Sequence, residues 1–175
     1  MKMFKRFAAA LLVGVMALAM LTACGESTSK IGKEFEDAAL AAINTARGEG
    51  AEALKNDEAL RDKALGQLCY VKGDGTIAKE NAAVATVLAV DETKNTAKLL
   101  VVSVLMEGNK SKDGVFKAKE ITAETLKQLS NVMTGPTVKA FQKIGIATKV
   151  VNGKTYAAAA YEMEVDAKTL KPLKK

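Results

Sequence analysis

The sequence predicts an α+β domain in which an antiparallel sheet is sandwiched between helices. Amphipathic helical spacing recurs over residues 34–47 and again near Leu60–Leu68. Two hairpin signals follow, the polar stretch Asp91–Thr96 between apolar runs and the dipeptide Asn152-Gly153. The run Ala157–Ala160 has no polar alternation, so we expect a strand covered by helices on both faces.

The first two helices are predicted from their apolar faces and their end signals. Residues 34–47 begin with acidic side chains and end in Arg47, matching the helix macrodipole, and Gly48 stops the helix. Its apolar face consists of Phe35, Ala38, Ala39, Ala42, Ile43 and Ala46. The second helix should start after a cap at Asn56 or Asp57 and run to about Leu68.

The rest of the chain supplies two hairpins and a third helix. Residues 85–90 and 98–106 are β-branched apolar runs that should form an antiparallel hairpin, followed by a loop over 108–119. Thr122 should cap a helix that ends at Gly135-Pro136. Asn152-Gly153 favours a type I′ turn, since both positions tolerate positive φ.

The N-terminus has the features of a secretory signal. Three basic residues precede the uncharged stretch 7–20, which falls short of the roughly 20 residues needed to span a bilayer. Leu21-Thr22-Ala23-Cys24 resembles the lipobox of bacterial lipoproteins, which implies a diacylglyceryl group on Cys24 and cleavage before it. We therefore divide the chain into a signal peptide (1–23), a lipidated cysteine and tether (24–33), one domain (34–168) and a basic tail (169–175).

Composition excludes several chemistries. Removing the three basic residues of the leader from the net charge of +6 leaves +3, and no basic run alternates with aromatics, so nucleic acid is not an expected partner. The chain has no histidine, which excludes catalytic triads and imidazole-bound zinc. If Cys24 is lipidated, Cys69 lacks a partner, and we expect a buried, unreactive thiol.

Several segments together resemble the CAP superfamily, also called SCP-like domains, which includes cysteine-rich secretory proteins, antigen 5 and pathogenesis-related 1 proteins. The segments are Asn44-x-x-Arg47, Leu54-x-x-Asp57-x-x-Leu60-x-x-x-Ala64, Lys79-Glu80-Asn81, residues 132–139 and the hairpin 144–156. The resemblance implies an α-β-α sandwich with a cleft in which Glu80 is one carboxylate and Val138 replaces a histidine. The hairpin at 85–106 departs from the family pattern, which continues there with a helix.

The functional expectation is a non-catalytic binding or interaction module, with neither metal nor cofactor. It would be anchored to the cell membrane through diacylglyceryl-Cys24, on the extracytoplasmic face of a bacterium, and would bind an unidentified small ligand or envelope partner. Two alternatives stay open. One is a hydrolase of the cell envelope that uses Glu80 with another carboxylate. The other is a lipoprotein of an unrelated α+β fold.

Overall fold

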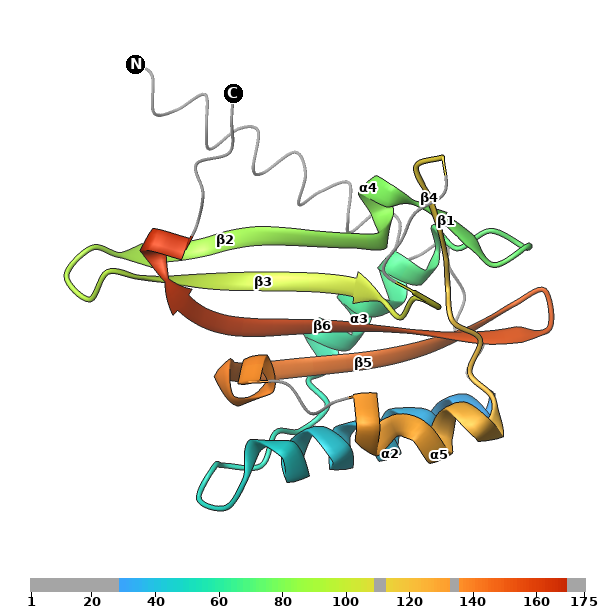
Figure 1. The fold of residues 1–175 in the computed structure, drawn as a ribbon, viewed down its shortest axis with the longest axis horizontal. Helices are drawn as coiled ribbons and strands as arrows, with labels where there is room; N and C mark the ends of the chain where they lie inside the picture. Colours follow the sequence, from blue (N-terminus) through green and yellow to red (C-terminus); the bar gives the residue numbers. More distant parts are fainter. Residues whose placement is uncertain (1–28, 109–112, 133–135, 170–175) are drawn as a thin grey trace.

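The computed structural model describes residues 29–108, 113–132 and 136–169. A four-stranded antiparallel sheet in the order β2-β3-β6-β5 forms the centre, and a two-stranded sheet, β1-β4, lies beside it (Figure 1). The α+β expectation is confirmed. The strands are β1 (Thr76–Ala78), β2 (Ala83–Asp91), β3 (Thr96–Val104), β4 (Val115–Lys117), β5 (Phe141–Val151) and β6 (Lys154–Asp166). The helices are α2 (Lys30–Arg47), α3 (Glu58–Leu68), α4 (Lys79–Ala82) and α5 (Ala123–Val132), with 3₁₀ turns η1 (Pro136–Ala140) and η2 (Ala167–Thr169).

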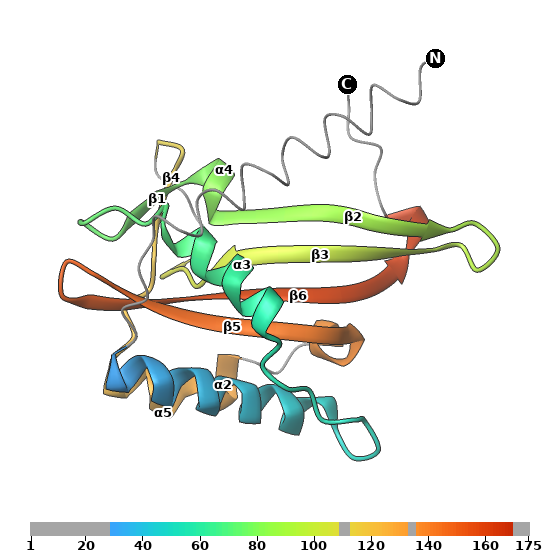
Figure 2. The ribbon, with the colours of Figure 1, turned by 180° about the vertical axis from the view of Figure 1, so that it is seen from behind.

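Helices cover both faces of the sheet near β5 and β6. Helix α3 crosses one face of the sheet and lies in front of it in Figure 2. Its leucines pack with Ala158 and Ala160 of β6. Helices α2 and α5 belong to the other face, where Phe35 and Leu129 pack with Ala157. Strand β6 lies between β3 and β5, and Ala157, Ala158 and Ala160 are each at most 2% exposed. The expectation of an alanine strand covered on both faces is therefore confirmed.

Helix α2 begins at Lys30, four residues before the expected start at Glu34. Ser29 is the cap, since its hydroxyl accepts a hydrogen bond from the Gly32 nitrogen at 3.1 Å. Gly32 is buried, and a Cβ there would lie 2.4 Å from the Thr148 hydroxyl of β5. The folded part therefore includes residues that the sequence analysis assigned to the tether. The close approach of Gly32 to Thr148 is a tertiary contact, and no local pattern in the sequence predicts it.

Helix α3 follows its sequence signals closely. Asp57 caps it by accepting a hydrogen bond from the Leu60 nitrogen at 3.0 Å. The helix rests on β5 at Gly145, where a Cβ would lie 2.1 Å from the Arg61 nitrogen. A glycine in the strand is what permits this contact between two backbones.

The small β1-β4 sheet was missed. Residues 108–119 were expected to be a loop, yet Val115–Lys117 pairs with Thr76–Ala78. Strands of three residues are too short to show a recognisable alternation of apolar and polar side chains. These two strands are also far apart in the chain, so no turn signal joins them. The predicted turn at Asn152-Gly153 is confirmed by φ angles of 50° and 76°. Thr122 caps α5 as expected, since its hydroxyl accepts from the Thr125 nitrogen at 3.3 Å, whereas Gly135 lies outside the described residues.

Candidate functional site: an open sheet edge and a charged cavity

The edge of the sheet at β5 is closed by polar groups from the segment before α3. The Asn56 side chain donates to the Ile146 carbonyl at 3.0 Å and accepts from the Ile146 nitrogen at 2.7 Å. The Asp57 nitrogen donates to the Ile144 carbonyl at 2.8 Å. These bonds satisfy backbone groups that an edge strand otherwise leaves available for pairing.

A buried carboxylate closes the next part of the same edge. Glu36 of α2 is 2% exposed, and its Oε1 accepts hydrogen bonds from both the nitrogen and the hydroxyl of Thr148, each at 2.9 Å. Its Oε2 accepts from Arg61 Nε of α3 at 3.3 Å. One side chain thus joins α2, α3 and β5. The sequence analysis assigned the acidic start of this helix only to the macrodipole, and no local pattern distinguishes a buried glutamate there.

Two residues of the CAP-like motif also act at this edge. Asn44 accepts from the Leu54 nitrogen at 2.8 Å and donates to the Leu54 carbonyl at 2.9 Å, which holds the loop between α2 and α3. Arg47 Nη1 donates to the carbonyl of Phe141 at the start of β5. In this structure the pair has a structural role.

The opposite edge, β2, is open. Strand β2 pairs with β3 on one side, and no other described strand pairs with it. Its residues are exposed from Ala83 to Val90, including four large apolar side chains. Their exposed fractions are 41% for Val84, 49% for Val87, 45% for Leu88 and 56% for Val90. The stretch contains no charged residue or proline, two of the features with which edge strands usually avoid unwanted pairing, and a bulge interrupts it between Val87 and Ala89.

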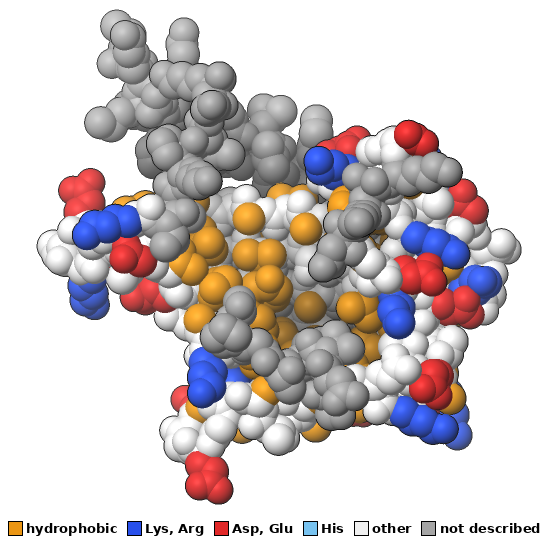
Figure 3. Space-filling view, in the orientation of Figure 1, with side chains coloured by type: hydrophobic (Ala, Val, Ile, Leu, Met, Phe, Trp, Pro, Cys, Tyr) orange, Lys and Arg blue, Asp and Glu red, His pale blue; other side chains and the backbone are white. Residues whose placement is uncertain are grey.

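The apolar surface continues from β2 across the neighbouring strands. Val87, Leu99 and Met163 are in register on β2, β3 and β6. Ala85, Val101 and Tyr161 form a second row in the same way. Apart from Val87 and Ala85, which are exposed, these side chains are half-buried. Hydrophobic side chains gather over this part of the sheet in Figure 3. Such a continuous apolar surface on a folded domain typically marks an interaction site.

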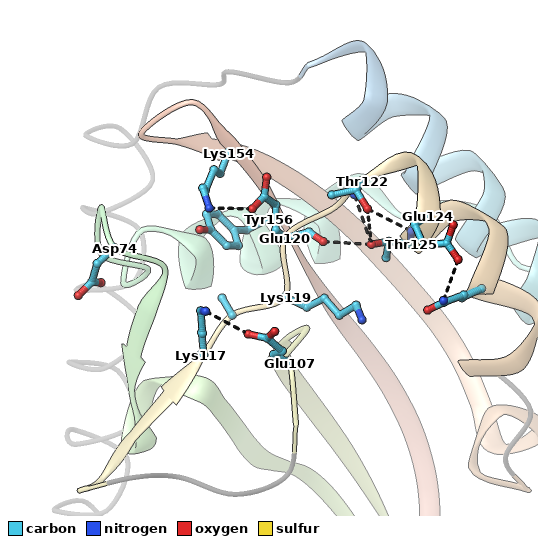
Figure 4. A pocket seen from close by; sticks show the side chains of 12 residues that line it. Asp74, Glu107, Lys117, Lys119, Glu120, Thr122, Glu124, Thr125, Lys154 and Tyr156 are labelled. Carbon is cyan, nitrogen blue, oxygen red and sulfur yellow. Dashed lines mark hydrogen bonds and ion pairs between the residues drawn. The ribbon is translucent and has the colours of Figure 1, made fainter.

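A charged cavity of ≈ 370 Å³ lies between β4, α5 and the start of β6 (Figure 4). Lys154 Nζ is 2.9 Å from Glu120 Oε2, and Lys117 Nζ is 3.4 Å from Glu107 Oε2. The hydrogen bond to Glu120 raises the pKa of Lys154 above its ordinary value. Two of the cavity's carboxylates are therefore paired with lysines, and their charge is locally balanced.

The structure does not bring Glu80 and Val138 together. Glu80 is exposed on α4, next to the β2 edge, and makes no hydrogen bond or ion pair with the described residues. Val138 is 6% exposed in η1, which precedes β5, and packs with Phe35 and Phe141. Because β2 and β5 are opposite edges of the sheet, these two residues do not share a cleft.

The cysteines differ from expectation. Cys69 follows α3, is half-buried rather than buried, and is disulfide-bonded, so the expected free thiol is wrong for this structure. The other cysteine of the sequence, Cys24, lies outside the described residues. Within those residues, no group of three or more His, Cys, Asp or Glu side chains is arranged to hold a metal ion.

Comparison with known proteins assigns neither a family nor a function to the chain. No family model, curated protein or solved structure matches the chain. None of the helices in the described part of the chain is long and apolar enough to cross a membrane. The CAP likeness and the lipobox therefore stay predictions from the sequence, and the case for a functional surface depends on geometry.

Proposed function

We propose that the protein is a membrane-anchored extracytoplasmic lipoprotein whose domain is a non-catalytic interaction module. Its anchor is a diacylglyceryl group on Cys24, which excludes a disulfide between Cys24 and Cys69 in the anchored protein. Its binding surface is the β2 edge with the two apolar rows beside it. The proposal combines the lipobox of the leader with the surface that β2 presents.

The observation that carries the proposal is the contrast between the two edges. Side chains from α2 and the α2–α3 loop satisfy the backbone of β5, whereas the residues of β2 from Ala83 to Val90 are exposed, with apolar side chains on both faces of the strand. An edge of this kind suits strand addition, in which a partner strand gains main-chain hydrogen bonds and places alternate side chains on each face.

The charges of the cavity do not favour the alternative of a hydrolase. A pair of catalytic carboxylates needs two environments that separate the pKa values of the acid and the base. Glu120 and Glu107 instead each face a lysine, and Glu80 stands exposed on another element. The absence of histidine from the sequence leaves no imidazole to serve as a base.

Site-specific photo-crosslinking in intact cells tests this function. A photoreactive amino acid replaces Val84 or Val90 on β2 in separate variants, and Ala41, an exposed residue of α2, serves as the matched control position. We expect discrete crosslinked species from the β2 positions and none from position 41. Equal yields at all three positions, or no product from β2, would contradict an interaction surface at this edge.

A further inference from the structure

We propose that two copies of the chain pair through their β2 strands, antiparallel and about a two-fold axis, to form one continuous eight-stranded sheet. This inference rests on the proposed function, because it names the partner of the same edge.

The first part of β2 has the length and the side chains needed to pair with β2 of a second copy. Residues 83–87 form the regular part of β2, and a bulge follows between Val87 and Ala89. Five residues is about the usual length of a paired strand. With Ala85 on the axis, Val84 pairs with Thr86 of the second copy and Ala83 with Val87. All of these side chains are uncharged and small or β-branched, which suits a sheet interior.

The charges that flank β2 favour the antiparallel arrangement. Lys79 and Glu80 precede the strand, Asp91 is its last residue and Glu92 follows it. Antiparallel pairing about Ala85 brings Lys79 of one copy toward Asp91 of the other. Parallel pairing would instead place Asp91 and Glu92 beside their own counterparts, and like charges directly opposite each other destabilise a sheet.

The closed edge limits the assembly to two copies. Among the described residues, the four-stranded sheet has one open edge, because the edge at β5 is occupied by Asn56, Asp57 and Glu36. A two-fold contact uses the same patch on both copies and closes on itself. Pairing through β2 therefore leaves only the two protected β5 edges at the ends of the joined sheet, so growth into a fibre stops.

The test is a charge exchange at position 85, measured by sedimentation of the mature full-length protein extracted in detergent. The wild type should be a dimer. Ala85→Lys and Ala85→Glu should each raise the dissociation constant by up to about fivefold, because like charges then face each other across the axis. An equimolar mixture of the two variants should recover dimers, now heterodimers. Ala41→Lys, the same change at an exposed position of α2, should leave the dimer intact.

Each other result overturns the dimer. A monomeric wild type excludes it, and dimers that survive both substitutions place the interface elsewhere. Loss of dimers without recovery in the mixture excludes pairing about Ala85. If the wild type is monomeric while β2 still crosslinks to a different protein, the edge is an interaction surface with another partner, so the proposed function stands and the dimer falls.

Discussion

Glu36 is the residue whose environment departs furthest from its sequence context. A glutamate in the first turns of a helix is normally solvated, yet this one is 2% exposed and binds Thr148 and Arg61. Burying a carboxylate is costly unless its oxygens find donors, and here both oxygens do. The donors come from β5 and α3, so the carboxylate depends on the complete tertiary structure.

Replacing Glu36 by alanine should lower the free energy of unfolding by about 2–4 kcal/mol, because the Thr148 groups and Arg61 would lose a buried acceptor. Urea denaturation of the purified protein measures this. Glu34→Ala, at an exposed position of the same helix, is the matched control and should change stability by no more than about 0.5 kcal/mol. Equal effects of the two substitutions would show that the buried carboxylate contributes nothing specific.

At the scale of single residues, the sequence predicted caps well and tertiary contacts poorly. Asp57 and Thr122 were predicted because a cap acts within three residues of the chain. Glu36 was not predicted, because its partners lie 25 and 112 residues away.

At the scale of elements, the contact between α3 and β5 fixes how closely the helix approaches the sheet. Gly145 leaves room for the backbone of Leu60 and Arg61, and a Cβ there would lie 2.6 Å from Leu60 Cβ. Since the obstruction is largely backbone, rotation of a side chain cannot relieve it. The helix itself would have to move away from the strand.

Gly145→Ala should therefore destabilise the protein by about 1–3 kcal/mol, the usual cost of overpacking a well-packed core. Gly108→Ala is the control, because a Cβ at Gly108 meets nothing within 4 Å. Thermal unfolding followed by circular dichroism compares the two. A melting temperature for Gly145→Ala equal to that of the control would mean that α3 can move away from β5 without lowering the stability of the protein.

Among the elements, those with a clear period were predicted and those without one were not. The amphipathic helices and both hairpins appear within a few residues of their expected bounds, because alternation and turn chemistry are local. The β1-β4 pair has three residues a strand and was missed. The hairpin of β2 and β3 was predicted, but its open edge was not, since an apolar run such as Ala83–Val90 ordinarily indicates a buried strand.

At the scale of the whole molecule, the proposed lipid anchor would decide where the open edge works. Cys24→Ser should move the protein from the membrane fraction to the soluble fraction or leave the leader uncleaved, because serine offers no thiol to the diacylglyceryl group. Phase partitioning in detergent, followed by immunoblotting, measures the change. Ser27→Ala, a substitution that spares the lipobox, should partition like the wild type. Equal partitioning of the serine variant, with its leader removed, would contradict lipidation.

The cap at Ser29 has a further consequence if Cys24 carries lipid. The Ser29 hydroxyl also lies 2.9 Å from the Thr155 hydroxyl, so the first residue of the folded domain is fixed to the sheet. Only five residue steps separate Cys24 from Ser29, and an extended chain covers at most about 3.3–3.6 Å per residue. Ser29 would thus be held within about 18 Å of the bilayer surface. The diffusion of the domain would be two-dimensional, so a second anchored copy would meet β2 by diffusing in the same plane.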